Sequence, residues 1–125
     1  MIEIDERAVE ALLADDPGGP VVMLNLLRFR PDGGRESYRR YAEALGPAIS
    51  PRYGVQVEYM GDGGRALVAE DGQAWDMVLL VRYPSRQAFA DMIRDPEYRA
   101  VTHLRSEALV ESVLQPTMPL VGRAV

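Results

Sequence analysis

Asn25 is the first candidate for chemistry, because it is an amide in the middle of the apolar run VVMLNLLRF, between Leu24 and Leu26. A buried amide needs hydrogen-bond partners, since leaving one unpaired costs about 1–3 kcal/mol. Asn25 can present a donor and an acceptor to a carbonyl or enolate oxygen of a ligand. It can equally bond to a neighbouring side chain or a buried water, and the sequence leaves both interpretations open.

Arg105 is the second candidate, because it lies on an apolar face of a predicted helix. With about 100° per residue, that face also carries Tyr98, Val101, Thr102, Ala108 and Leu109. The guanidinium therefore points towards the sheet and needs an acidic or carbonyl partner. Asp76, at the start of the strongest predicted strand, is the expected partner. An Arg105–Asp76 pair would anchor the helix, or Asp76 would orient Arg105 while it holds a substrate carboxylate.

His103 is the only histidine and the only side chain that ordinarily titrates near neutrality. On the same helical projection it lies beside Arg99 and Ser106, away from the Arg105 face. We therefore expect His103 to be exposed. If the helix or a dimer partner brought it to a pocket, it would be the leading general base.

Four tyrosines are expected to point inward: Tyr38, Tyr41 and Tyr98 from helices, and Tyr83 from the end of a strand. Aromatic residues at such spacing usually form core. Buried tyrosine hydroxyls still require partners, so these residues could also line a pocket for a flat organic molecule. Trp75, beside Asp76, is expected to seal one end of the fold.

The composition excludes several classes of function. A chain of 125 residues with 47% hydrophobic residues fits one domain with a real core. A net charge of -5 argues against nucleic acid as a partner. The arginines at 35, 39 and 40 are interspersed with acids and are read as solvated surface.

The sequence gives little support for a metal site, a reactive thiol or a phosphate-binding loop. There is no cysteine, and a single histidine makes a transition-metal site improbable. The sequence GDGG is followed by no helix and the chain has no lysine, so it is a turn rather than a phosphate loop. The turn EDG at 70–72 has too few ligands for a calcium loop. The acidic N-terminus predicts neither a signal peptide nor a membrane span, and we expect a soluble, cytoplasmic protein.

The pattern of apolar residues and breakers predicts helices and strands in a regular order. Asp5, Ser85 and Asp95 are expected helix caps. The predicted helices are 5–14, 35–49, 85–94 and 95–110, and the predicted strands are 21–30, 55–61, 66–70, 75–84 and 111–116. The segment ALVAE, 66–70, is expected to pair back as a hairpin.

This order predicts an α+β, ferredoxin-like βαββαβ sandwich, with helices on one face of an antiparallel sheet. The expected division is an N-terminal helical extension and linker (1–20), the ferredoxin-like domain (21–117) and a C-terminal tail (118–125). Strands 21–30 and 75–84 are apolar on both faces, whereas a sheet with one wet face should alternate. A partner subunit that completes a dimeric α/β barrel is the simplest cover for the second face. The alternative is that the N-terminal helix covers it.

Three stretches together resemble the family called domain of unknown function 1330, of the dimeric α/β-barrel superfamily: YRRYAEALGPAI, EDGQAWDMVLLVRYPSRQAF and DPEYRAVTHLRSEAL. The resemblance covers about residues 20–117, and its most specific pieces are YPSRQAF and DPEYRAV. The lead-in GPVVMLNLLRF is similar to a branch with an N-terminal extension. The resemblance implies a ferredoxin-like homodimer, with a pocket between sheet and helices.

The resemblance implies little chemistry. Related superfamily members include cofactor-free monooxygenases, lactone isomerases, polyketide cyclases and haem-degrading enzymes. The haem-degrading members use an Asn, a Trp and a His, and this chain has Asn25, Trp75 and His103 in that order. His103, however, lies later than the family's histidine and is expected to turn outward, so no haem or other cofactor is predicted.

The leading hypothesis is a small-molecule-binding protein that acts as a cofactor-independent enzyme on a small organic acid or polyketide-like ring. The reaction would be isomerisation, cyclisation or oxygenation, with Asn25 stabilising an oxyanion and Arg105 holding the anion. The alternative is a non-catalytic ligand-binding or sensing homodimer, which needs no general base. A third possibility is an interaction module whose own side chains fill the pocket.

Overall fold

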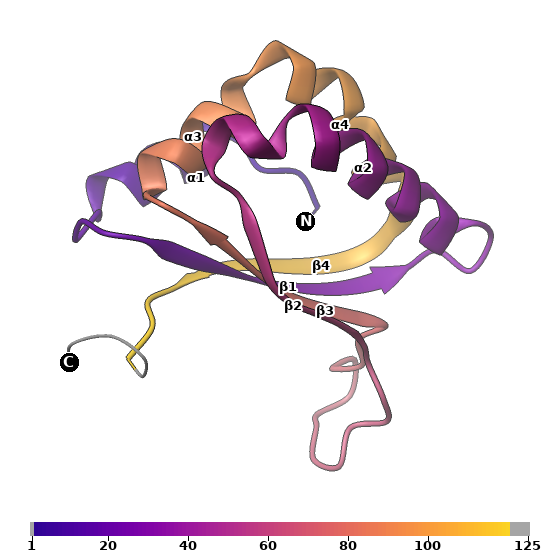
Figure 1. Cartoon of the computed structure of the whole chain (residues 1–125). Helices are drawn as coiled ribbons and strands as arrows, with labels where there is room; N and C mark the ends of the chain where they lie inside the picture. The colour runs from indigo at the N-terminus through magenta and orange to yellow at the C-terminus, as the bar shows by residue number, and fades with distance from the viewer. Residues whose placement is uncertain (1, 121–125) are drawn as a thin grey trace.

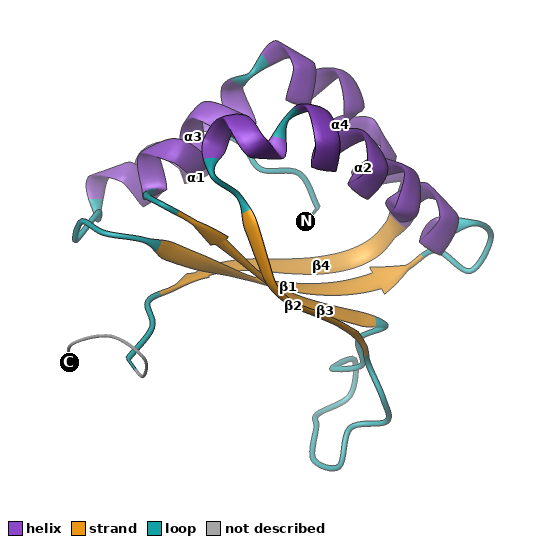
Figure 2. Ribbon diagram, in the orientation of Figure 1, coloured by secondary structure: helices purple, strands orange, loops and turns teal. Residues whose placement is uncertain are grey.

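The computed structural model describes residues 2–120 and contains one four-stranded antiparallel sheet in the order β2-β3-β1-β4. Its helices lie together on one side of that sheet (Figures 1 and 2). The elements are α1 (Glu6–Ala14), β1 (Val21–Phe29), α2 (Gly34–Ala48), a 3₁₀ turn (Ser50–Tyr53), β2 (Gln56–Asp62), β3 (Met77–Tyr83), α3 (Arg86–Arg94), α4 (Pro96–Ala108) and β4 (Leu109–Thr117). After α1 the order is βαββαβ, which confirms the predicted ferredoxin-like fold. Residues 121–125 of the expected tail lie outside the described part.

The three predicted helix caps are confirmed. The side chains of Asp5, Ser85 and Asp95 accept backbone hydrogen bonds at the starts of α1, α3 and α4. Pro47 lies inside α2, and the helix ends just after it at Ala48. Helix α4 ends at Ala108, two residues before the predicted end, because the backbone at Leu109 is already extended and starts β4.

The predicted hairpin strand at 66–70 is wrong. Residues 63–76 form a loop that extends from the sheet on the side away from the helices (Figure 1). The segment ALVAE has the composition of a strand, but no described strand runs beside it. The side chains of Leu67 and Val68 are 99% and 95% exposed. A strand needs a partner for its backbone groups as well as suitable residues.

The base of this loop is nevertheless anchored, chiefly by Arg28 of β1. Its Nε donates to the backbone oxygen of Ala74 at 3.0 Å, and its Nη2 donates to the backbone oxygen of Gly72. The guanidinium also lies 4.9 Å from the centroid of the Trp75 ring. The loop therefore has a fixed base and an apolar, exposed tip.

The hydrophobic core lies between the sheet and the helices. Alternate residues of β1 point into it, and Leu27 is fully buried there. From the helices, the core receives Tyr38 and Tyr41 of α2, Phe89 of α3 and Tyr98 of α4.

The opposite face of the sheet carries apolar side chains that no helix of the described chain covers (Figure 2). Leu24 pairs with Leu80 and Leu26 with Val78 across β1 and β3, and all four are partly exposed. The alternative that the N-terminal helix covers this face is wrong. Helix α1 buries Val9 in the core on the helical side, where Arg86 of α3 donates to the backbone oxygen of Leu12 at 3.0 Å.

Candidate functional site

A cavity of about 150 Å³ lies between the sheet and the helices, where the sequence predicted a pocket. Asn25 of β1 and Leu79 of β3 contribute to the sheet side of its lining, and Arg105 of α4 contributes from above. The cavity brings together both predicted polar groups and four tyrosines: Tyr38, Tyr41, Tyr83 and Tyr98. The rest of the lining is almost entirely apolar.

Among the described residues that line this cavity, Arg105 alone is charged. Its side chain is buried, with 6% of the residue exposed. Nη1 donates to the backbone oxygen of Ile2 at 2.9 Å, whereas Nη2 is buried and has no hydrogen-bond partner among the described residues. Glu3, Asp5 and Glu6 line another hollow that Arg105 also lines, but no described carboxylate pairs with its Nη2. A buried guanidinium with a free donor attracts an anion, because pairing offsets the large cost of removing the charge from water.

The tyrosines contribute neutral hydroxyls. The hydroxyl oxygens of Tyr41 and Tyr98 lie 3.0 Å apart and share a hydrogen bond. Burial raises the pKa of Tyr38 to about 12, although the positive charge of Arg105 acts to lower it. Burial also raises the pKa values of Tyr41 and Tyr83 well above the ordinary range. At neutral pH these three hydroxyls are therefore protonated and can donate hydrogen bonds, but they are not bases.

Asn25 is buried, with 8% of the residue exposed. Its Nδ2 donates to the backbone oxygen of Met23 at 3.3 Å, which is at the long end of the hydrogen-bond range. Among the described residues, none donates a side-chain or backbone hydrogen bond to its Oδ1. The amide thus has a local partner for its nitrogen and a free acceptor beside the cavity.

The expected Arg105–Asp76 pair is not formed. The carboxylate of Asp76 accepts a hydrogen bond from the backbone nitrogen of Phe29 at 2.9 Å, while the Asp76 backbone nitrogen donates to Leu27. These bonds hold Asp76 at the end of the sheet where the 63–76 loop joins β3. Helical periodicity correctly predicted which way Arg105 points, but it contained no information on which residue it meets.

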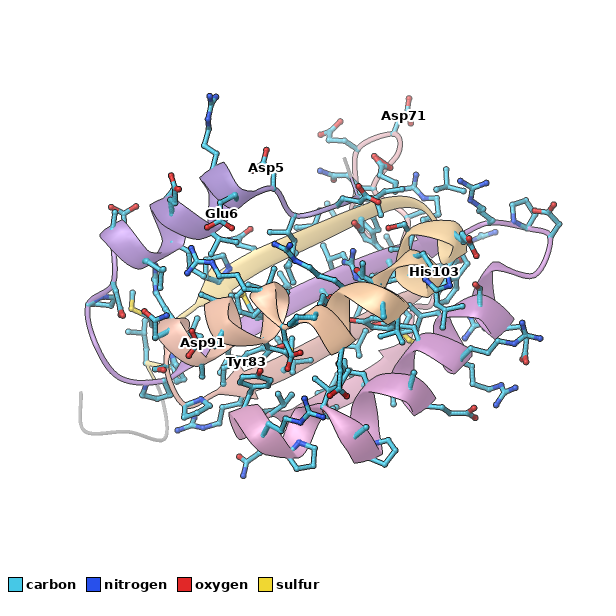
Figure 3. All side chains as sticks on the ribbon, turned by 90° about the horizontal axis from the view of Figure 1, so that it is seen from above. Asp5, Glu6, Asp71, Tyr83, Asp91 and His103 are labelled. Carbon is cyan, nitrogen blue, oxygen red and sulfur yellow. The ribbon has the colours of Figure 1, made fainter. Side chains whose placement is uncertain are left out.

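Trp75 and His103 also lie outside the cavity lining. Trp75 is half-buried against Arg28 at the base of the loop, rather than over the tyrosines. His103 is exposed, as the helical projection predicted, and Figure 3 shows it on α4 in the view from the helix side. The Asn, Trp and His of the haem hypothesis are therefore not gathered around one cavity, and the described residues contain no cluster of three or more side chains suited to a metal ion.

The N-terminal segment before α1 is part of the site, and the sequence interpretation missed it. Ile2 supplies the oxygen that pairs with Arg105, and Ile4 lines the cavity. Figure 1 shows this segment entering the space between the helices and the sheet. The alternation of Ile2, Glu3 and Ile4 was the available indication that this end of the chain is partly buried.

A second, larger hollow of about 370 Å³ lies next to this cavity, beneath α1 and at the β4 side of the sheet. It was not predicted either. Ile4, Phe89 and Leu114 line both hollows, so the two meet at these three side chains.

Comparison with known proteins agrees with the fold but adds no activity. Residues 33–115 match the family model described as Domain of unknown function (DUF1330). The protein RPA0582 of Rhodopseudomonas palustris, described as of unknown function, is 35% identical with a TM-score of 0.87, and the match covers 95% of this chain and 96% of that one. Its methylated form is 36% identical, with 98% of each chain covered.

More distant similarities show the fold alone. A dimeric protein of unknown function and ferredoxin-like fold from Bacteroides fragilis is 17% identical, with a TM-score of 0.52 and coverage of 78% of this chain and 94% of that one. A protein from Bacteroides thetaiotaomicron, whose given name places it among antibiotic biosynthesis monooxygenases, is 21% identical, with a TM-score of 0.58 and coverage of 85% and 95%. No protein with a curated description matches the chain.

Proposed function

Since this chain belongs to the family of the domain of unknown function 1330, whose description assigns no activity, we propose a function from the site itself: the protein binds a small organic anion in the cavity between sheet and helices. The observation that carries this proposal is Arg105, a buried guanidinium whose Nη2 has no partner among the described residues. An engineered apolar cavity of about 150 Å³ in another protein binds benzene, so a single-ring acid is a suitable size. Arg105 would hold the carboxylate or enolate, and the tyrosines would contact the ring.

Asn25 and the tyrosine pair would position the ligand. Asn25 Oδ1 can accept a hydrogen bond from a ligand hydroxyl, and the shared Tyr41–Tyr98 hydrogen bond can open to donate to a ligand oxygen. Asp76, Trp75 and His103, which were considered as site residues from the sequence, have no part in the proposal because they lie away from this cavity.

Cofactor-independent catalysis on such an anion is the second candidate function, by isomerisation, cyclisation or oxygenation. The presence of Arg105 and Asn25 in the lining of one cavity favours it, because a fixed positive charge stabilises an enolate or another oxyanion. The lining residues within 2–120 include no carboxylate and no imidazole, and burial keeps Tyr38, Tyr41 and Tyr83 protonated. Simple binding therefore has more support than a reaction that needs a general base.

Thermal unfolding with matched acids and amides tests the binding proposal. Benzoate and salicylate should raise the melting temperature in a concentration-dependent way, whereas benzamide and salicylamide should have little effect, because ligand binding to the native state alone stabilises it. Arg105→Met should abolish the difference, and the exposed-residue control Arg40→Met should retain it. Equal effects of acid and amide would contradict an anion site.

The catalytic alternative has its own test. The acid that stabilises the protein most would be incubated with it and analysed by mass spectrometry. Recovery of the unchanged acid supports a binding or sensing protein, whereas an isomer, a cyclised product or a product with added oxygen supports the enzyme. Loss of that product in Asn25→Leu would assign the amide to the reaction.

We further propose that two copies associate through the uncovered face of the sheet and so form a dimeric α/β barrel. Leu24, Leu26, Val78 and Leu80 supply an apolar centre on that face, and burial of such a surface drives association. Sedimentation velocity should show a dimer for the natural chain and a monomer for Leu24→Arg. Ala100→Asp, an exposed change on α4, is the matched control and should remain dimeric.

A further inference from the structure

The second hollow beneath α1 adjoins the Arg105 cavity over the same face of the sheet. On β1, Met23 lies under the second hollow and Asn25 under the first, two residues further along the same face. On β4, Pro116 and Leu114 are their respective partners. The distance between successive inward positions on a strand is only about 7 Å, so one elongated molecule can reach both hollows.

The second hollow is suited to an apolar group. Its lining includes Met23, Leu12 and Phe89. Ala8, Ala11 and Leu12 share the face of α1 towards it, and Asp15 lies just after the end of that helix. The small side chains of Ala8 and Ala11 are exposed and leave open the space between α1 and β4. In the part of the chain that the structure describes, the charged residues of its lining are Glu3, Asp15 and Arg86. Arg86 already donates a hydrogen bond to the backbone oxygen of Leu12.

We propose that the ligand is an amphipathic acid, with its carboxylate on Arg105 and an apolar tail that passes Ile4 and Phe89 into the hollow beneath α1. This inference rests on the proposed anion site and names the class of molecule it takes. Helix α1 lies outside residues 33–115, which match the family model. The N-terminal extension thus forms one side of the tail hollow, whereas Arg105 belongs to the part that matches the family.

Ile4 is the residue that makes the passage possible. It lines both hollows, is partly buried, and belongs to a segment without regular secondary structure. The same segment is held at Ile2 by Nη1 of Arg105. The carboxylate would pair with Nη2 and leave this bond in place, so the head and tail can bind while the segment stays attached to α4.

Calorimetric titration with butanoate, hexanoate, octanoate and decanoate tests the inference. Each added methylene group should tighten binding about fourfold, because burying one contributes about 0.8 kcal/mol. Ala11→Phe fills the hollow, so affinity should stop rising at a shorter chain length than in the natural protein. Ala14→Phe, the same change at an exposed position of α1 outside the lining, should behave as the natural chain.

Arg105→Met separates the two proposals, since it should weaken all chain lengths by the same factor. If short acids and benzoate bind in an Arg105-dependent way but affinity does not rise with chain length, the tail inference fails and the anion site stands. If Ala11→Phe and a second filling variant, Ala8→Phe, both keep the full chain-length dependence, the tail lies elsewhere and the inference also fails. If none of the acids binds, both proposals fail.

Discussion

Nη1 of Arg105 donates a hydrogen bond of 2.9 Å to the backbone oxygen of Ile2, which joins α4 to the first residue that the structure describes. The acceptor of this buried positive charge is therefore an uncharged backbone oxygen. Nη2 of the same guanidinium has no partner among residues 2–120. If position 105 served stability alone, we would expect either an arginine paired with a carboxylate or an apolar side chain there. This relationship is the reason for the proposal that Arg105 binds an anionic ligand.

Replacing Arg105 by methionine should leave stability unchanged or increase it. An incompletely paired buried charge costs free energy, and an apolar side chain of similar length removes that cost, so the free energy of unfolding should rise by about 0–2 kcal/mol. Urea denaturation of the natural chain and the variant measures the difference. A loss of more than about 2 kcal/mol would mean that the bond to Ile2 is a structural anchor.

The stability of the protein should fall in alkaline solution because of Tyr38. Burial raises its folded-state pKa to about 12, whereas an unfolded tyrosine titrates near 10. Between about pH 10 and 12 the unfolded chain loses this proton and the folded one keeps it, so stability present below pH 10 is lost as pH rises to 12. One such group contributes about 2–3 kcal/mol.

The matched variant for this effect is Tyr38→Phe, which has no proton to lose. Between pH 10 and 12 its free energy of unfolding should fall less steeply than that of the natural chain. The difference in slope corresponds to the one proton that Tyr38 keeps in the folded state and loses in the unfolded state. Identical slopes would show that Tyr38 ionises in the folded protein as it does in the unfolded one. Tyr41 and Tyr83 should keep some alkaline sensitivity in the variant, because burial raises their pKa values too.

Two glycines of α2 should differ in their tolerance of alanine. A Cβ at Gly34 would lie 2.5 Å from the backbone oxygen of Ala108, so Gly34→Ala must push α2 away from the end of α4 and should cost about 1–3 kcal/mol. Apart from its chain neighbours, a Cβ at Gly46 meets nothing within 4 Å. Pro47 follows it inside α2 and disfavours the helical conformation for a residue with a Cβ, which offsets the helix preference of alanine, so Gly46→Ala should change stability by less than about 0.5 kcal/mol. Thermal unfolding of both variants checks the pair.

The exposed loop should contribute to the proposed dimer. Leu67 and Val68 are almost fully exposed at its tip, and the loop extends on the same side as the uncovered sheet face (Figure 1). The double change Leu67→Asp and Val68→Asp should raise the dimer dissociation constant by tenfold or more, on the order of 1.4 kcal/mol, as measured by sedimentation equilibrium. If the dimer dissociation constant is unchanged in the loop variant while Leu24→Arg is still monomeric, the interface involves the sheet and not the loop.

The fold could be predicted well from the sequence because the spacing of apolar residues and the helix caps are features of short segments of the chain. Apolar runs bounded by turn residues predicted β1 and β3, and Asp5, Ser85 and Asp95 marked the helix starts. The inward direction of Arg105 and the outward direction of His103 both followed from helical periodicity. The strand at 66–70 failed because composition cannot show whether a neighbouring strand is available to pair with it.

The site was predicted only in part, because its contacts join distant segments. Periodicity brought Asn25, Arg105 and the tyrosines to one layer, where the cavity does lie. It could not show that the N-terminal segment would reach Arg105 before Asp76 does, or that α1 would leave a hollow beside β4. Both features depend on the path of the chain in space. The spacing of residues within one helix or strand does not contain that information.

The most direct test of the central claim is the guanidinium nitrogen spectrum of Arg105, followed by nuclear magnetic resonance of arginine-labelled protein during titration with benzoate. The signal that is absent from Arg105→Met should shift saturably with benzoate and stay in place with benzamide. If that signal does not move while benzoate shifts only the signals of exposed arginines, Arg105 does not bind the anion and the proposed site is wrong.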